Sequence, residues 1–283
     1  MRERMTLLAY AKLNLSLRVL GKREDGFHEI LSLVQTIDLA DRIELARCGS
    51  GIRVENDLVG LVGQDLAERA AIDVLRAKGV HAGCSIRIRK SIPAGGGLGG
   101  GSSDAASVIY GIDQLIPPSL PTGGAADIAA GIGSDVPLFL LGGRVRVSGR
   151  GERTAPVEGP PEGAFVVVVP PIHCDTGAVY RGWSARGAVD RPRGTASLDL
   201  GENDLLQPAL ALAPALARYL AAVRDAGGEY SGMSGSGSSF YSAYRREEDA
   251  GGAARALETM FPEARVFCCR PVSAGFRVCQ EDQ

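Results

Sequence analysis

The chain has 283 residues, of which 45% are hydrophobic and 23% charged, and its formal net charge is −2. This length favours two ordinary domains. The near-neutral charge does not indicate nucleic acid as a partner, and no apolar run reaches the roughly 18 residues that a membrane span needs. The N-terminus lacks the pattern of a signal peptide, so we expect a cytoplasmic protein. Six cysteines without paired spacing predict reduced thiols, and three dispersed histidines do not suggest a zinc cluster.

The first ninety residues predict mainly strands. Residues 13–20 alternate apolar and polar side chains, a turn follows at 21–26, and further strands are expected at 28–39 and 41–46. Apolar residues then recur at helical spacing over 65–78, and Gly79 is a suitable stop. Alternation returns at 84–90, which predicts a strand directly before the most distinctive segment of the chain.

That segment is a glycine-rich loop between a predicted strand and a predicted helix. It consists of Pro93, Ala94, Gly95, Gly96, Gly97, Leu98, Gly99, Gly100, Gly101, Ser102 and Ser103. Glycine lets the backbone adopt left-handed conformations and approach a ligand closely, and the new helix directs unpaired N–H groups at an anion. The loop therefore predicts a phosphate site. A flexible linker is the alternative, but linkers do not lead straight into an amphipathic helix.

The remainder of the chain mixes helices and strands. After the glycine loop we expect these elements in order: a helix to Ile116, a short helix at 125–130, strands at 145–147 and 164–170, a loop at 184–201, a helix at 205–226, a strand, glycine turn and strand at 229–244, and a helix at 249–261. A glycine-, proline- and charge-rich stretch at 149–163 marks the boundary between domains at 1–155 and 156–283. The fold class is α+β with largely antiparallel sheets.

Two common phosphate loops do not fit this segment. A Walker A loop ends in Gly-Lys-Ser/Thr, whereas Gly101 is followed by two serines. The dinucleotide fingerprint is formally present, but the preceding strand alternates and does not read as a buried parallel strand. A second glycine cluster at 231–239 lies between two predicted strands, so two donor-rich loops from two domains suggest a cleft; read alone, this cluster is also compatible with a decorated hairpin turn.

These residues carry a family resemblance. Residues 93–106 resemble the ATP loop of the GHMP kinases, and Met233-Ser-Gly-Ser-Gly237 resembles their third motif. The segments 9–17, 23–28, 133–139 and 203–205 are similar, in order and spacing, to the branch of that family that phosphorylates a cytidine-diphosphate-linked methylerythritol. The resemblance implies an N-terminal domain like ribosomal protein S5 domain 2 and a ferredoxin-like α/β sandwich at the C-terminus.

The resemblance implies transfer of the γ-phosphoryl group of ATP, with Mg²⁺, to the 2-hydroxyl of that small-molecule acceptor, in the non-mevalonate isoprenoid route. Asp135 is then the candidate base, and Lys12 is expected beside it, where an ammonium keeps the carboxylate ionised. Read without the family, Asp135 is equally compatible with a helix N-cap, and Lys12 with an edge-strand lysine. Metal ligands are not indicated, although Ser102 and Ser103 are suited to phosphate or magnesium.

The resemblance also assigns a substrate pocket. Its residues are Asn14, Phe27, His28, Asp135, Tyr180 and Gly235, among which an aromatic face stacks on the pyrimidine and polar groups read its edge. The chain departs from the family at the proline-rich segment 117–130 and at Ser238-Ser239. Another small-molecule GHMP kinase and a non-catalytic nucleotide-binding relative are the alternatives. We expect a monomer or a weak homodimer.

Overall fold

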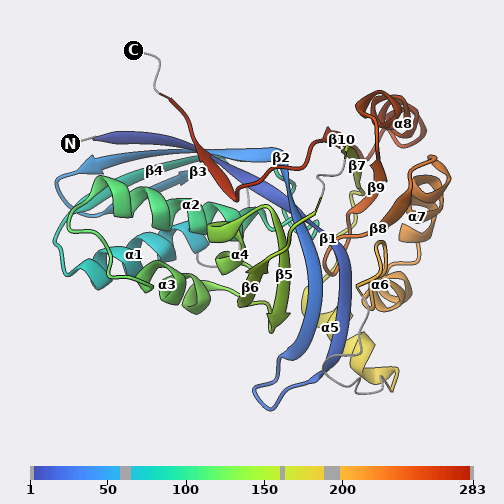
Figure 1. Ribbon diagram of the computed structural model, residues 1–283, viewed down its shortest axis with the longest axis horizontal. Coiled ribbons are helices and arrows are strands. Elements are labelled where there is room, and N and C mark those ends of the chain that lie inside the picture. The colour runs from blue at the N-terminus through green and yellow to red at the C-terminus, as the bar shows by residue number, and fades with distance from the viewer. Residues whose placement is uncertain (1–2, 58–64, 160–162, 188–197, 281–283) are drawn as a thin grey trace.

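The computed structural model describes residues 3–57, 65–159, 163–187 and 198–280, and it places two largely antiparallel sheets side by side (Figure 1). The first sheet has the order β11-β1-β2-β4-β3, with β5 on β2 and β6 on β5; its strands are β1 (Arg4–Lys22), β2 (His28–Cys48), β3 (Ile52–Asn56), β4 (Gly83–Arg89), β5 (Arg144–Gly149), β6 (Arg153–Pro156) and β11 (Phe276–Val278). The second has the order β10-β7-β9-β8, made of β7 (Ala164–Val169), β8 (Tyr230–Met233), β9 (Phe240–Tyr244) and β10 (Arg265–Cys269). Between the described strands, β3 with β4 is the parallel pair, which confirms the α+β class with largely antiparallel sheets.

The helices form separate groups around the two sheets (Figure 1). They are α1 (Leu66–Lys78), α2 (Gly100–Leu115), α3 (Gly124–Ile132), α4 (Val136–Leu141), α5 (Thr176–Ala185), α6 (Leu206–Leu212), α7 (Leu216–Asp225) and α8 (Glu247–Met260). The first four lie on one face of the first sheet, and α7 and α8 pack on the second. The helix α5 lies beside the β1–β2 hairpin, which projects from the molecule. Among the described helices we find none with the length and apolar character of a membrane span.

Several elements differ from the sequence prediction. The strands expected at 28–39 and 41–46 are one continuous strand, β2, and the helix expected at 205–226 is divided in two. Its break comes at Pro214, which lacks the N–H that a continuing helix would use. The helix α5 was not predicted, and only its last two residues fall in the loop expected at 184–201; the strand β6 lies in the stretch expected as a linker.

The two sheets are joined by a shared core and by the chain itself. Ala11, Leu13 and Leu15 of β1 are fully buried against Phe165 and Tyr241 of the second sheet, together with further residues of one apolar cluster. The last strand, β11, leaves the second half and pairs with β1. The division at residue 155 stays a prediction, and the end of the chain adds a strand to the first sheet.

Candidate active site

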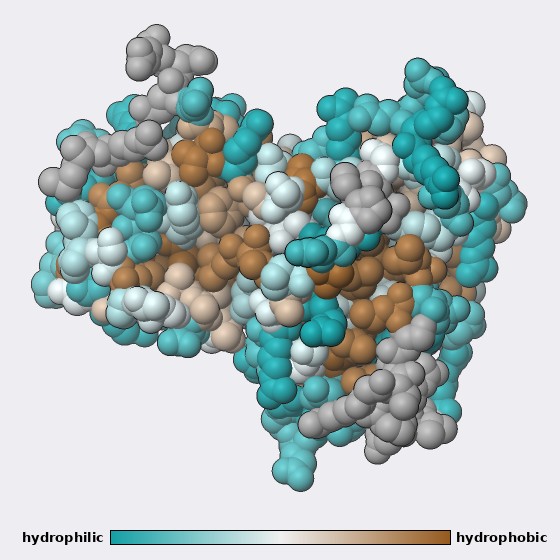
Figure 2. Space-filling view, viewed as in Figure 1, coloured by the Kyte–Doolittle hydropathy of each residue, from teal (hydrophilic) through white to brown (hydrophobic). Residues whose placement is uncertain are grey.

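A cavity of about 940 Å³ lies between the two halves of the molecule. Strand β1, the β1–β2 hairpin, the turn before α4, α5 and both glycine loops supply its lining, which includes Lys12, Asn14, Phe27, His28, Asp135, Tyr180 and Gly235. These are the residues that the sequence resemblance assigned to catalysis and to the acceptor. In the surface view, hydrophobic residues show in patches on both halves of the molecule, and the projecting hairpin is hydrophilic (Figure 2).

The glycine-rich loop 93–103 separates this cavity from a second one of about 370 Å³. Gly97 and Gly99 line both cavities, and the smaller one continues along the loop to Ser102 at the first turn of α2. Gly95, Gly97 and Gly99 have φ values of 72°, 76° and 75°, which glycine adopts readily and other residues do not. Leu98 is buried, so its side chain anchors the loop while the glycine backbone faces the cavities.

The two glycine clusters are in direct contact. The Ser234 hydroxyl donates a hydrogen bond to the Gly97 carbonyl at 2.9 Å, and a Cβ on Gly97 would lie 2.2 Å from the Ser234 carbonyl oxygen. Asn203 holds the second cluster by donating to the carbonyls of Met233 and Gly235, each at 2.8 Å. The pair of loops that suggested a cleft therefore forms one continuous backbone surface.

Lys12 and Asp135 face each other at the junction of the loops. The Lys12 ammonium lies 3.7 Å from the Asp135 carboxylate and donates to Asn14 Oδ1 at 2.5 Å. The Lys12 side chain is 4% exposed, and this burial lowers its pKa from the usual value although Asp135 opposes the shift. Asp135 is 40% exposed and open to the cavity, so the pair combines a fixed cation with an accessible carboxylate.

Asp135 precedes α4, but its side chain makes no capping hydrogen bond there. The local sequence pattern is typical of an N-cap, and the structure instead leaves the carboxylate to Lys12 and the cavity. Lys12 is likewise not an exposed edge lysine, since its side chain is buried and its backbone N–H donates to the Leu98 carbonyl at 3.0 Å.

An aromatic cluster forms the far end of the cavity. His28 stacks on Tyr180 with ring centroids 4.9 Å apart, meets Trp183 edge-on at 5.6 Å, and shares a hydrogen bond of 2.8 Å with the Ser184 hydroxyl. Burial and the nearby Lys22 charge lower the pKa of His28, which favours the neutral form of its ring. A neutral imidazole has one donor and one acceptor nitrogen, which suits the recognition of a base edge.

Phe27 and Asn14 occupy different settings from His28. Phe27 is 49% exposed at the cavity wall, with the Arg150 guanidinium 5.1 Å from its ring centroid. Asn14 is buried, and its amide accepts from Lys12 and donates to Ser32 at 2.8 Å, so it positions the ammonium.

The two serines after the glycines differ in exposure. Ser102 is partly exposed and lines the smaller cavity, whereas Ser103 is fully buried and its hydroxyl makes no hydrogen bond within the described residues. Within those same residues we find no cluster of three or more His, Cys, Asp or Glu side chains arranged for a metal ion.

Sequence reasoning missed Trp183, Ser184 and Arg150. The first two lie on α5, whose sequence was expected to end in a loop, and their helical spacing from Tyr180 was the available signal. Arg150 stands in the segment interpreted as a linker. It lines the cavity, where its guanidinium lies over the ring of Phe27, a residue far away in the sequence.

Comparison with known proteins places this site in a family. The model for the GHMP kinase N-terminal domain matches residues 65–143, and that for the C-terminal domain matches residues 194–263. The 4-diphosphocytidyl-2-C-methyl-D-erythritol kinase of Moorella thermoacetica is 35% identical over 93% of this chain and 98% of its own length. The corresponding enzyme of a Geobacter species (strain M21) is 37% identical over 90% of this chain and 95% of its own.

Solved structures agree in fold. A crystal structure of 4-(cytidine 5'-diphospho)-2C-methyl-D-erythritol kinase has a TM-score of 0.80 and 35% identity, and the alignment covers 94% of this chain and 99% of that one. A homoserine kinase from Cytophaga hutchinsonii has a TM-score of 0.74 over 99% of this chain and 98% of its own, but only 18% identity, so it supports the fold alone. The chain belongs to the GHMP kinases, in the 4-diphosphocytidyl-2-C-methyl-D-erythritol kinase family.

Proposed function

We propose that this protein transfers the γ-phosphoryl group of ATP to the 2-hydroxyl of 4-diphosphocytidyl-2-C-methyl-D-erythritol, as an alcohol kinase of non-mevalonate isoprenoid biosynthesis. The observation that carries the proposal is the single cavity in which the Lys12–Asp135 pair lies between the glycine loops and the His28–Tyr180 cluster. The relatives named for this activity align with nearly the whole chain, which supports the same acceptor.

Each part of the transfer has residues suited to it. The glycine loop and the first turn of α2 offer backbone N–H groups for the phosphates of ATP. The Asp135 carboxylate accepts the proton of the attacking hydroxyl or orients it, and the Lys12 ammonium stabilises the charge that develops on the oxygen. His28 and Tyr180 hold the pyrimidine, while Asn14, Phe27 and Gly235 complete the acceptor pocket.

Mg²⁺ fits this site as a companion of the nucleotide. The ion usually keeps several waters and binds through substrate phosphates with one or two protein oxygens. Ser102, at the edge of the smaller cavity, offers such an oxygen. When bound, the ion neutralises phosphate charge, and the glycine loop positions the phosphates. Cytoplasmic location and a monomer or weak homodimer stay predictions.

The test is ADP release by the purified protein with Mg-ATP and one of four acceptors. We expect turnover with 4-diphosphocytidyl-2-C-methyl-D-erythritol and none with mevalonate, homoserine or galactose. Turnover with one of the other three would reassign the protein to another branch of the GHMP kinases. Nucleotide binding without turnover on any acceptor would favour a non-catalytic relative, an alternative against which the retained Lys12 and Asp135 argue.

A further inference from the structure

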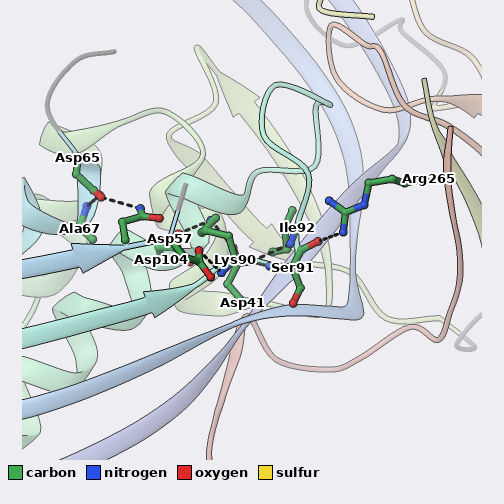
Figure 3. A network of polar contacts seen from close by, with 10 residues as sticks. Asp41, Asp57, Asp65, Ala67, Lys90, Ser91, Ile92, Asp104 and Arg265 are labelled. Carbon is green, nitrogen blue, oxygen red and sulfur yellow. Dashed lines mark hydrogen bonds and ion pairs between the residues drawn. The ribbon is translucent and has the colours of Figure 1, made fainter. Parts of the chain in front are cut away.

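A buried group of three ionisable side chains lies at the base of the glycine loop and has no part in the chemistry proposed above (Figure 3). It consists of Asp41 on β2, Lys90 directly after β4, and Asp104 in the first turns of α2. The Lys90 ammonium pairs with both carboxylates, at 2.5 Å to Asp104 and in still closer contact with Asp41. The three side chains are 0–6% exposed, so the group is held within the fold.

Asp41 also holds the chain just before the loop. Its Oδ1 accepts the backbone N–H groups of Ser91 at 2.6 Å and of Ile92 at 2.8 Å, which immediately precede Pro93. The carboxylate reaches this point from a strand that bulges, because the pairing of β1 with β2 skips residues 38–39. A bulge redirects the side chains beside it. One carboxylate thus fixes the two residues at which the loop begins.

The end of the loop is connected to the same carboxylate through Lys90. Asp104 follows Ser103 directly, and its Oδ2 accepts from the ammonium that Asp41 also contacts. Lys90 and Ile92 lie directly under the first turn of α2, since a Cβ on Gly100 would come within 3.3 Å of the ammonium and 3.1 Å of Ile92 Cγ2. Both ends of the loop are therefore tied to Asp41.

This arrangement is costly for stability and useful for position. Charges removed from water lose hydration that their mutual attraction only partly returns, so buried ion groups are poor sources of stability. Two carboxylates share one ammonium, and burial raises the pKa of Asp104 to about 8. A loop with six glycines in seven residues has few side chains of its own to fix it, and loose ends would cost conformational entropy when a ligand binds.

We propose that Asp41 is a positioning residue, which aligns the phosphate-binding N–H groups of the glycine loop by fixing the loop at both ends. This inference rests on the nucleotide-binding role of the loop given under the proposed function. Asp41 touches neither substrate nor reacting atoms in this arrangement. Its effect should fall mainly on the nucleotide, because the side chains of the acceptor pocket come chiefly from β1, the hairpin and α5, and the glycine loop reaches that cavity only at Gly97 and Gly99.

The test compares Asp41→Asn with Asp57→Asn. Asp57 Oδ1 accepts the Lys90 N–H at 2.8 Å from an exposed position, so its variant removes a neighbouring carboxylate and leaves the bonds of Asp41 to Ser91 and Ile92 in place. Affinity for Mg²⁺ with a non-hydrolysable ATP analogue is measured by calorimetry, and affinity for the cytidyl acceptor separately. For Asp41→Asn we expect the nucleotide Kd to rise at least about tenfold, as for a lost charge-assisted hydrogen bond, and the acceptor Kd to stay within about twofold. The Asp57→Asn control keeps both constants within about twofold.

Hydrogen exchange of residues 91–103 without ligand adds a readout independent of activity. We expect faster exchange in Asp41→Asn than in the parent protein. If that variant does not fold, Asp41→Glu keeps the charge and displaces the carboxylate by one methylene, and the same loss of nucleotide affinity is expected. Parent-like nucleotide affinity in either folded variant overturns the inference, as does an equal loss for both ligands. If the parent protein binds no nucleotide, the proposed function is wrong. The hydrogen-exchange measurement then still tests the anchoring alone: equal exchange rates of residues 91–103 in the parent and in Asp41→Asn would show that Asp41 does not fix the loop.

Discussion

Replacement of Asp135 by asparagine distinguishes two possible roles of this carboxylate: electrostatic support of the Lys12 ammonium, and acceptance or orientation of the hydroxyl proton. Unit charges 3.7 Å apart attract by about 4.5 kcal/mol at a dielectric constant of 20 and by about 1.1 kcal/mol at 80. Asp135 is 40% exposed, so the lower figure applies, and a carboxylate that only supports the ammonium accounts for roughly a sixfold loss of kcat. A carboxylate that takes or orients the hydroxyl proton accounts for at least ~10²-fold.

We expect the larger loss, with both substrates still bound nearly normally. The measurement is kcat from ADP release at saturating Mg-ATP and acceptor, with calorimetry for each ligand. Asp127→Asn is the matched control, because it removes an exposed carboxylate from the first turn of α3, outside the cavity lining. Its kcat should stay within about twofold of the parent. A parent-like kcat for Asp135→Asn would refute the catalytic role, and a sixfold loss would reduce it to electrostatic support.

Three further changes probe the substrate pocket, the loops and the charged group. His28→Ala should raise the Kd of the cytidyl acceptor about tenfold, since a stacked base contributes about 1–3 kcal/mol, and unchanged affinity by calorimetry would remove His28 from the pocket. Gly97→Ala should weaken ATP binding at least about tenfold and lower the melting temperature, because its Cβ would overlap the Ser234 carbonyl at a φ of 76°. Gly131→Ala, which meets no atom within 4 Å, is its control and should be neutral or stabilising, while ATP affinity equal to the parent in Gly97→Ala would contradict the packing of the two loops. In the folded protein the pKa of Asp104 is raised from 3.8 to about 8, so this group loses its stabilising contribution as pH rises through that window. The melting temperature of Asp104→Asn relative to the parent should therefore increase from pH 5 to pH 9, and a pH-independent difference would contradict the buried position of this carboxylate.

Strong local signals in the sequence predicted the elements that dominate the first half. The glycine loop and the apolar face after Ala105 predicted α2, because residues close together in the sequence indicate both where the helix starts and which side is buried. The helix α5 has no comparable signal: among its ten residues only Val179 is buried. Its aromatic side chains instead contact the distant hairpin through His28. Contacts of this kind are invisible to periodicity.

The same limit applies to the site. The sequence alone predicted a phosphate-binding loop, since six glycines before a helix have one strong physical interpretation. It did not join Lys12 to Asp135, because the local pattern around Asp135 is equally typical of a helix cap. The family resemblance supplied that pairing. Neither the sequence pattern nor the family resemblance predicted the hydrogen bonds from the loop to Asp41. Asp41 reaches Ser91 beside a strand bulge, and no pattern in the sequence of β2 indicates that bulge.

Strand β1 explains why the cation and the interface between the two sheets occur together. Side chains alternate along a strand, so Ala11, Leu13 and Leu15 point into the apolar core shared with the second sheet. The intervening residues, Lys12 and Asn14, then face the cavity and hydrogen-bond to each other. A shift of one residue in the pairing with β2 would exchange these faces and bury an ammonium among aliphatic side chains. The same register of β1 on β2 therefore places the apolar residues in the shared core and Lys12 next to Asp135. A shifted register should disrupt the core and the Lys12–Asp135 pair together.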